Sequence, residues 1–225
     1  MNQSDDRYLR NYPALNREEQ KLLMSKRVMI AGCGGQGGYL LELLLRLGVG
    51  AIVAVDPDRF ASDNLNRQLL SQVELLGTSK TDAVRARAAQ VNPDVRVETY
   101  AVRLDEQSTP MLLPGCDLVF DALDSTKSRK MLAAACAKAH IPMVHGATTG
   151  WTAQAAVTMP GDHLIDQIYP EETDHIDNSV LSFTPALCAS IQAALGTQLL
   201  VGRRVKTGTL FTIDLQRMKT ESIHP

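Results

Sequence analysis

Short apolar runs alternate with longer helical segments along this chain, and their order predicts an α/β fold. Strands are expected at residues 27–31, 51–55, 95–101, 117–121 and 141–146. Helices are expected in the leucine-rich segment that follows the first strand and at residues 79–91, 105–113 and 127–139. Repeated alternation of strand and helix predicts a doubly wound, mainly parallel sheet with flanking helices.

The pattern changes after Trp151, where we expect a C-terminal antiparallel extension of the sheet. A strand at 154–159, an amphipathic helix at 184–201 and a last strand at 210–214 are predicted, followed by a polar tail. Between them, residues 160–182 have little periodicity, and a loop of this length is usually functional or disordered. We therefore predict an N-terminal arm with a helix (1–26) and one domain (27–225) that contains a flexible loop (160–182).

Composition restricts the class of protein. With 225 residues, 44% apolar and 21% charged, the chain resembles an ordinary soluble protein with a full core. A net charge of −2 gives no electrostatic basis for binding nucleic acid or an anionic membrane. No segment is typical of a signal peptide or a membrane span, so a cytoplasmic location is expected.

The four cysteines, at 33, 116, 136 and 188, form no C-x-x-C pair. Reduced thiols packed as small apolar residues are the expected state, and a structural zinc built from cysteines is disfavoured. The His and Asp residues of the 162–182 stretch, which include His163 and His175, match no established ligand spacing.

A glycine-rich turn joins the first strand to the first helix. Its glycines are Gly32, Gly34, Gly35, Gly37 and Gly38. Such a turn lets the backbone approach a phosphate, and the helix N-terminus supplies N–H groups and a positive dipole end. Asp56 ends the next strand, where nucleotide-binding folds place the acid that bonds a ribose hydroxyl. The pattern fits a dinucleotide-dependent dehydrogenase as well as an ATP-binding enzyme.

Polar residues follow the second strand at the edge of the sheet where ligands bind. They are Asp58, Asn64, Arg67 and Gln68. Arginine can bond phosphate oxygens bidentately, so this cluster favours phosphate binding. Lys80 lies in the first turn of a helix for which Ser79 and Asp82 predict a capping arrangement, and a cation there is expected to meet an anion. Asp124, at a strand-to-helix junction, suits a helix N-cap and a Mg²⁺ ligand equally well.

Taken together, these residues resemble the ThiF/MoeB/HesA family, the adenylyltransferase superfamily that includes ubiquitin-activating enzymes. The resemblance covers about residues 7–215, with motifs in family order. They are Arg7-Tyr-x-Arg10, Gly32-x-Gly34-Gly35-x-Gly37, Asp56-x-Asp58, Asn64-Leu-x-Arg67-Gln68, Gly77-x-x-Lys80, Asn92-Pro93, Asp121-x-x-Asp124 and Gly146-Ala147. The resemblance implies a Rossmann-like fold that binds ATP rather than NAD.

The resemblance also implies roles for individual residues. The glycines, Asp58 and Gln68 would bind the nucleotide, and Asp56 would bond its ribose. Asn64, Arg67 and Lys80 would hold the triphosphate, and Asp124 would bind Mg²⁺. Arg10 matches an arginine that reaches into the neighbouring subunit, which implies a homodimer. The implied reaction adenylates the C-terminal Gly-Gly carboxylate of a small β-grasp, ubiquitin-like sulfur-carrier protein and releases pyrophosphate.

Two departures from the family pattern narrow this expectation. The two C-x-x-C pairs that bind zinc in many members are absent, so no zinc is expected. Residues 160–182 also contain no cysteine for thioester or persulfide chemistry, and Cys188 lies on a helix face that predicts burial. The sequence therefore predicts an enzyme that stops at the acyl-adenylate.

Three rival interpretations remain. The first is ATP-dependent activation of another carboxylate, on a small molecule or an RNA, although the acidic balance disfavours RNA. The second is a non-catalytic module that only docks a carrier, which gives no reason to keep Arg10, Arg67, Lys80 and Asp124. The third is an NAD(P)-dependent oxidoreductase, which explains the glycines and Asp56 but leaves Arg67, Lys80 and Arg10 without a role.

Overall fold

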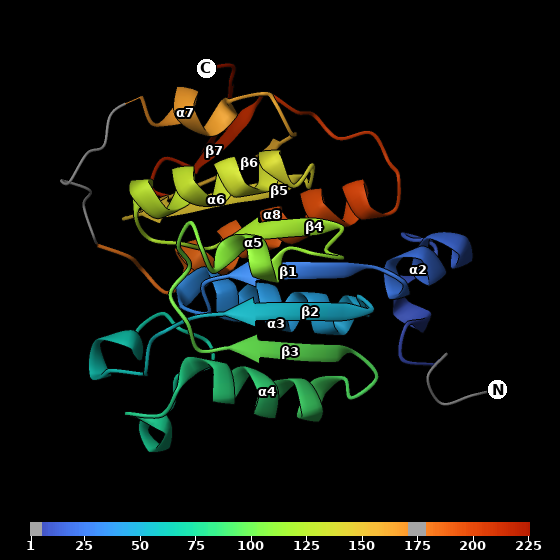
Figure 1. The fold of residues 1–225 in the computed structure, drawn as a ribbon, viewed down its shortest axis with the longest axis vertical. Coiled ribbons are helices and arrows are strands. Elements are labelled where there is room, and N and C mark those ends of the chain that lie inside the picture. The colour runs from blue at the N-terminus through green and yellow to red at the C-terminus, as the bar shows by residue number, and fades with distance from the viewer. Residues whose placement is uncertain (1–5, 171–178) are drawn as a thin grey trace.

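The computed structural model describes residues 6–170 and 179–225, and its centre is one sheet of eight strands in the order β3-β2-β1-β4-β5-β6-β7-β8 (Figure 1). The first five strands in the chain are parallel to one another, and β6, β7 and β8 continue the sheet in antiparallel fashion. The strands are β1 (Arg27–Ala31), β2 (Ala51–Val55), β3 (Arg96–Tyr100), β4 (Leu118–Asp121), β5 (Met143–Thr149), β6 (Thr152–Thr158), β7 (Leu210–Asp214) and β8 (Lys219–Ile223). The predicted fold class is confirmed.

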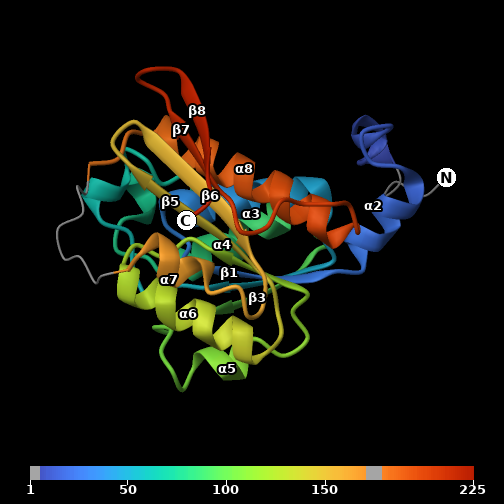
Figure 2. The same ribbon diagram turned by 90° about the horizontal axis from the view of Figure 1, so that it is seen from above.

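Helices cover both faces of the sheet, as Figure 2 shows from above. Helices α3, α4 and α8 lie on one face, and α5, α6 and α7 lie on the other. The helices are α2 (Arg17–Met24), α3 (Gly35–Leu47), α4 (Lys80–Val91), α5 (Thr109–Leu112), α6 (Thr126–Lys138), α7 (Leu164–Ile168) and α8 (Phe183–Leu200). Short 3₁₀ turns are η1 (Leu9–Asn11), η2 (Ser62–Asn64) and η3 (Val73–Leu75).

The central strands are apolar on both sides because each side faces a helical layer. Val28 and Ile30 of β1 belong to the core cluster that includes α3 and α8 residues. Met29 and Ala31, which alternate with them, pack in a second cluster with Leu132 of α6. This two-sided burial explains why parallel strands read as continuous apolar runs in the sequence.

The structure corrects three local predictions. The polar tail after residue 214 contains a strand that the sequence does not predict, because residues Lys219–Ile223 form β8 against β7. The 160–182 stretch contains α7, although the sequence showed no helical pattern there. The helix expected at 105–113 is limited to Thr109–Leu112. The rest of the predicted loop includes residues 171–178, which lie outside the described residues.

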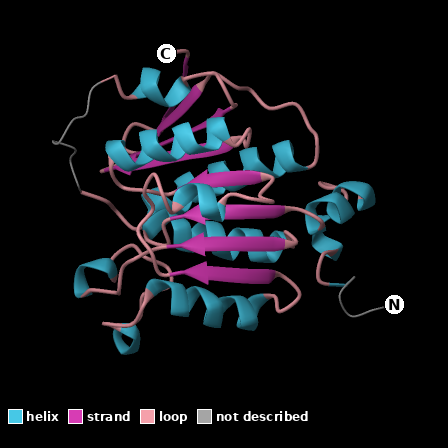
Figure 3. Cartoon of the chain, in the orientation of Figure 1, coloured by secondary structure: helices cyan, strands magenta, loops and turns pink. Residues whose placement is uncertain are grey.

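All strands of the parallel part end at the same edge of the sheet, on the left in Figure 3. The turn before α3, the loop after β2 and the loop after β4 therefore meet there, as expected for open α/β sheets. The described part of the N-terminal arm and α2 lie beyond the opposite ends of these strands (Figure 1).

Candidate active site

The glycine-rich turn is packed so tightly that two of its positions exclude any side chain. Gly32 has φ of +95°, and a Cβ atom there would stand 2.6 Å from the Ala122 carbonyl oxygen. A Cβ atom on Gly37 would collide with the Gly32 carbonyl oxygen. Helix α3 thus starts directly against the ends of β1 and β4, with its first N–H groups at the edge of the sheet. The turn has the geometry that anion-binding helix N-termini share.

Asp56 connects this turn to the loop after β2. The residue is 5% exposed, and its two carboxylate oxygens accept hydrogen bonds from the Cys33 N–H (2.7 Å) and the Asp58 N–H (2.8 Å). The Nζ of Lys80 lies 3.1 Å from Asp58 Oδ2 and 3.8 Å from Asp56 Oδ1. The structure therefore brings Asp56, Asp58 and Lys80 together beside the glycines.

Lys80 is 6% exposed, which is unusual for a lysine. It is the first residue of α4, as predicted, but the predicted capping arrangement is wrong. The Ser79 hydroxyl makes no cap hydrogen bond and instead lies 2.8 Å from the Thr81 hydroxyl. With Asp58 as its nearest anionic partner, Lys80 presents a desolvated positive charge at a helix N-terminus, where an anion is favoured.

The loop around η2 covers the outer side of the glycine turn. Gln68 is 7% exposed, its amide lies against Gly34, and its Oε1 is buried with no hydrogen-bond partner in the described part of the chain. Asn64 is buried and its Oδ1 accepts a hydrogen bond from the Ala61 N–H. Arg67 is half-buried, and its guanidinium donates to the Asp63 carbonyl (2.7 Å). Gln68, a buried amide with an unused acceptor, fits a site that a polar ligand completes.

Asp124 follows β4 at the same edge of the sheet. Its side chain is exposed and forms no hydrogen bond or ion pair with the residues that the structure describes. The N-cap of α6 is Ser125, whose hydroxyl accepts from the Ser128 N–H at 3.2 Å. The alternative that Asp124 serves as the helix cap is therefore wrong. A free carboxylate beside the glycine turn suits the oxygen-rich coordination that Mg²⁺ prefers.

Arg10 is not brought to this site within one chain. It lies in η1, and the neighbouring Tyr8 packs against Gly48, at the C-terminal end of α3. The glycine turn lies at the other end of that helix, which has 13 residues and is therefore about 20 Å long. Arg10 and the glycine turn consequently lie toward opposite ends of α3, and Figure 1 shows the N-terminal arm on the side of the sheet away from the loops at the strand ends.

A buried polar network, which no sequence pattern predicts, lies beneath the site. Asp121 and His145, on adjacent strands, are 2.7 Å apart, with the His145 Nδ1 facing Asp121 Oδ2. The Tyr169 hydroxyl lies 3.1 Å from the His145 Nε2 and accepts a hydrogen bond from Arg129 Nη1 at 3.1 Å. The residues are 24 positions or more apart in all three contacts, so no local motif could have joined them.

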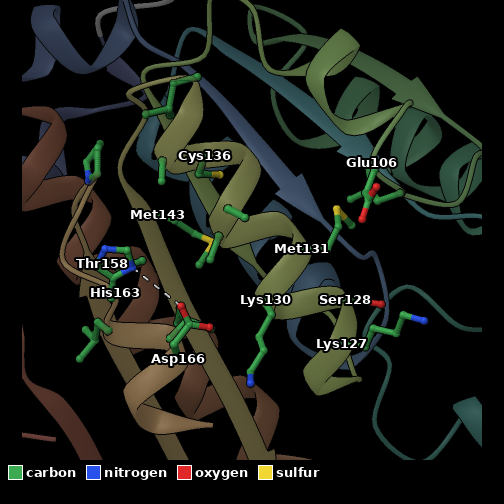
Figure 4. A pocket seen from close by; sticks show the side chains of 18 of the residues that line it. Glu106, Lys127, Ser128, Lys130, Met131, Cys136, Met143, Thr158, His163 and Asp166 are labelled. Carbon is green, nitrogen blue, oxygen red and sulfur yellow. Dashed lines mark ion pairs between the residues drawn. The ribbon is translucent and has the colours of Figure 1, made fainter. Parts of the chain in front are cut away.

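A cavity of about 1170 Å³ lies on the face of the sheet that α6 and α7 cover (Figure 4). Helix α6 forms one wall and the turn before α7 forms the other. Lining residues include Leu104, Ser125, Lys127, Met131, His163 and Asp166. None of the predicted phosphate-binding residues lines this cavity. His163 and Asp166 form a 3.9 Å ion pair, and no group of three metal-ligating residues occurs among the described residues.

All four cysteines are buried and reduced. Burial raises the pKa of the Cys188 and Cys136 thiols to about 12 in each case, and it also raises the pKa of Cys33 and Cys116. Thiols with a raised pKa and no exposure are poor nucleophiles. The described structure therefore contains no thiol suited to sulfur or thioester transfer.

Comparison with known proteins identifies the family. The sequence model of the ThiF family matches residues 7–225. The chain belongs to the ThiF family. The predicted resemblance to ThiF, MoeB and HesA proteins is thereby confirmed.

Two curated relatives illustrate what other ThiF-family members do. The SAMP-activating enzyme E1 of Haloferax volcanii is 32% identical in an alignment of 227 positions that covers 97% of this chain and 84% of that protein. The sulfur carrier protein adenylyltransferase of Thermus thermophilus is 36% identical over 154 residues, or 68% of this chain and 57% of that protein. The prediction of an enzyme of the adenylyltransferase class is confirmed at this level.

The fold of this ThiF-family chain is also found among solved structures. The crystal structure of E. coli MccB with ATP superposes with a TM-score of 0.84 at 22% identity, over 97% of this chain and 71% of that one. This similarity supports the fold alone.

No helix in the described residues is long and apolar enough to cross a membrane.

Proposed function

We propose that this protein uses ATP and Mg²⁺ to adenylate the C-terminal Gly-Gly carboxylate of a small ubiquitin-like sulfur-carrier protein. The catalytic domain would span residues 27–225, and the protein would act as a homodimer to which each arm (1–26) contributes Arg10. The observation that carries the proposal is the buried Lys80 beside the glycine turn, together with relatives that act on SAMP and sulfur-carrier proteins.

The residues at the sheet edge suit the charge changes of this reaction. A carboxylate oxygen of the carrier attacks the α-phosphorus of ATP, and the bond from that phosphorus to the bridging oxygen breaks, so that pyrophosphate leaves. Negative charge builds up on the phosphate oxygens, and fixed cations placed beforehand stabilise it. Lys80 and Arg67 supply those cations from one chain, and Arg10 supplies one from the other.

Lys80 must exchange partners for this to occur. Its Nζ lies 3.1 Å from a carboxylate of Asp58 whose side chain is 57% exposed. The Asp58 carboxylate can therefore turn into water when a phosphate replaces it. Lys80 is then already desolvated and placed, so little reorganisation is needed at the moment of reaction.

Mg²⁺, when bound, would neutralise phosphate charge, and Asp124, exposed and without a partner among the described residues, is the carboxylate that would hold it. No general base is required because the carrier's carboxylate is ionised at neutral pH. The absence of a cysteine from residues 160–182 and the burial of all four thiols support release of the acyl-adenylate without a thioester step.

Thermal unfolding with Mg·ATP, Mg²⁺ alone or NADH tests the nucleotide assignment. A ligand at about 100 times its Kd adds about 2.7 kcal/mol to the free energy of unfolding. Mg·ATP should stabilise the wild-type protein, and Lys80→Ala and Arg67→Ala should each weaken the effect. Lys21→Ala, at an exposed position on α2, is the matched control and should respond like wild type.

ATP–pyrophosphate exchange then tests the substrate. Exchange should require a β-grasp carrier that ends in Gly-Gly and should be lost when that carrier is truncated by its last two residues. Exchange with a small carboxylic acid and not with carriers would assign the protein to the alternative substrate class. Stabilisation by NADH rather than Mg·ATP would overturn the proposal and favour an oxidoreductase.

A further inference from the structure

The Tyr169 hydroxyl is the centre of the buried polar network beneath the site. It follows α7, and its oxygen receives hydrogen bonds from the Gln154 Nε2 (2.9 Å) and the Arg129 Nη1 (3.1 Å). Among the described residues, the acceptor that its own proton faces is the His145 Nε2 at 3.1 Å. The hydroxyl therefore uses its full hydrogen-bonding capacity, as one donor and a double acceptor.

The protonation of His145 fixes the direction of these bonds. The ring is 0% exposed, and burial lowers its pKa, although the neighbouring Asp121 acts in the opposite direction. A neutral His145 donates its Nδ1–H to the Asp121 carboxylate at 2.7 Å, so its Nε2 is left as an acceptor. That acceptor is the atom that the Tyr169 hydroxyl faces.

Both branches of the network end on the residue before Asp124. The Asp121 Oδ1 accepts the Leu123 N–H at 3.0 Å. Arg129 donates from Nε (3.1 Å) and from Nη2 (2.8 Å) to the Leu123 carbonyl oxygen. The Leu123 N–H is thus held by Asp121, which His145 contacts, and the Leu123 carbonyl oxygen is held by Arg129.

We propose that Tyr169 is a positioning residue whose hydroxyl orients His145 and Arg129 and thereby fixes the backbone at Leu123 that carries Asp124. Helix α7 forms part of a wall of the large cavity and packs on α6, so the position of α7 is transmitted to the carboxylate at the sheet edge. The expected effect on Mg²⁺ binding at Asp124 rests on the proposed function, whereas the expected effect on the backbone at Leu123 does not.

Tyr169→Phe isolates the hydroxyl, because the ring keeps its own contacts. The His145 ring packs edge-on at 5.6 Å between centroids, and the Arg129 guanidinium carbon lies 5.5 Å from the Tyr169 ring centroid. Tyr100→Phe is the matched control. The Tyr100 hydroxyl lies on β3 at 3.5 Å from Glu98 and takes no part in the network.

The first measurement is amide hydrogen exchange of the protein without ligands. Tyr169→Phe should speed exchange in a peptide that covers residues 122–125 by about fivefold, the factor expected for loss of one ordinary hydrogen bond. Tyr100→Phe should leave that peptide unchanged. Equal exchange in wild type and Tyr169→Phe, or equal acceleration in both variants, would overturn the proposal.

The second measurement is the Mg²⁺ concentration that gives half of the stabilisation by ATP. Tyr169→Phe should raise this midpoint severalfold and leave the stabilisation at saturating Mg²⁺ close to wild type, a split that a general loss of stability would not produce. An unchanged midpoint together with faster exchange would refute the link to Asp124. If wild-type protein does not respond to Mg·ATP, the proposed function fails, and the exchange measurement still decides the role of Tyr169.

Discussion

Gly37 carries the closest backbone approach of the whole site. The Gly32 carbonyl oxygen occupies the space that a side chain at this position would need. The collision involves backbone on both sides, so no rotamer change can relieve it. Gly35, two residues earlier, is different, because a Cβ atom there would meet Pro185 Cβ at 3.4 Å, an ordinary contact.

Gly37→Ala should therefore lower the free energy of unfolding by about 3 kcal/mol or more, the upper range for overpacking in a site that cannot shift. Gly35→Ala should cost much less. Urea denaturation of both variants makes the comparison. Similar losses in the two would show that the turn adapts and that the contact at Gly37 is soft.

The four cysteines should be unreactive in the folded protein. Because all four are buried and their pKa values are raised, none should react with a disulfide reagent at pH 8 while the protein is folded. All four should react in denaturant. Rapid modification of one thiol in the native protein would contradict their burial and reopen a thiol-dependent step.

Strand β5 is predicted correctly from the sequence, but the environment of the histidine within it is not. Its apolar residues predict a buried strand, but they do not indicate that His145 is enclosed with no exposure. A histidine held neutral inside the protein makes stability depend on pH. Its folded pKa is lowered, so below pH 6.5 the unfolded chain takes up a proton that the folded chain does not.

Stability should consequently fall as the pH drops below about 6.5, by up to about 1.4 kcal/mol per pH unit from this residue. His145→Asn should show a shallower slope in that range, even if it is less stable at pH 8. Chemical denaturation at pH 5.5, 6.5 and 7.5 provides the measurement. Parallel slopes for wild type and variant would mean that another group causes the pH dependence.

The elements that the sequence did not predict are those with little periodicity to detect. Helix α7 has five residues, too few to establish a 3.6-residue pattern, and β8 is exposed along its length and lies at the edge of the sheet beside β7. The glycine turn, Asp56, Lys80 and Asp124 could be placed because parallel topology gathers strand ends at one edge. The contact between His145 and Tyr169 depends on tertiary packing, which leaves no local signal.

At the scale of the molecule, the N-terminal arm and the site lie at opposite ends of α3. The arm is held there by Tyr8 against Gly48 and by Arg7, which donates hydrogen bonds to Asn92 and Asp94. An Arg10 side chain cannot span the length of that helix. If Arg10 takes part in adenylation, as we propose, it must do so in the site of another copy.

Mixing two inactive variants tests this arrangement. Arg10→Ala and Lys80→Ala homodimers should each lose most adenylation activity. After unfolding and refolding together, the mixture should recover about one quarter of wild-type activity, because half of the dimers are mixed and each has one complete site. Recovery no greater than the sum of the two variants would show that both residues serve the same chain or that Arg10 is not needed.

The distance between arm and site also affects how the cell would control this enzyme. When the protein is scarce enough that most copies are monomers, the number of complete sites rises with the square of its concentration. Halving expression in that range would leave about one quarter of the sites. The supply of activated carrier would then respond more steeply to gene dosage than that of an enzyme whose catalytic residues all lie in one chain.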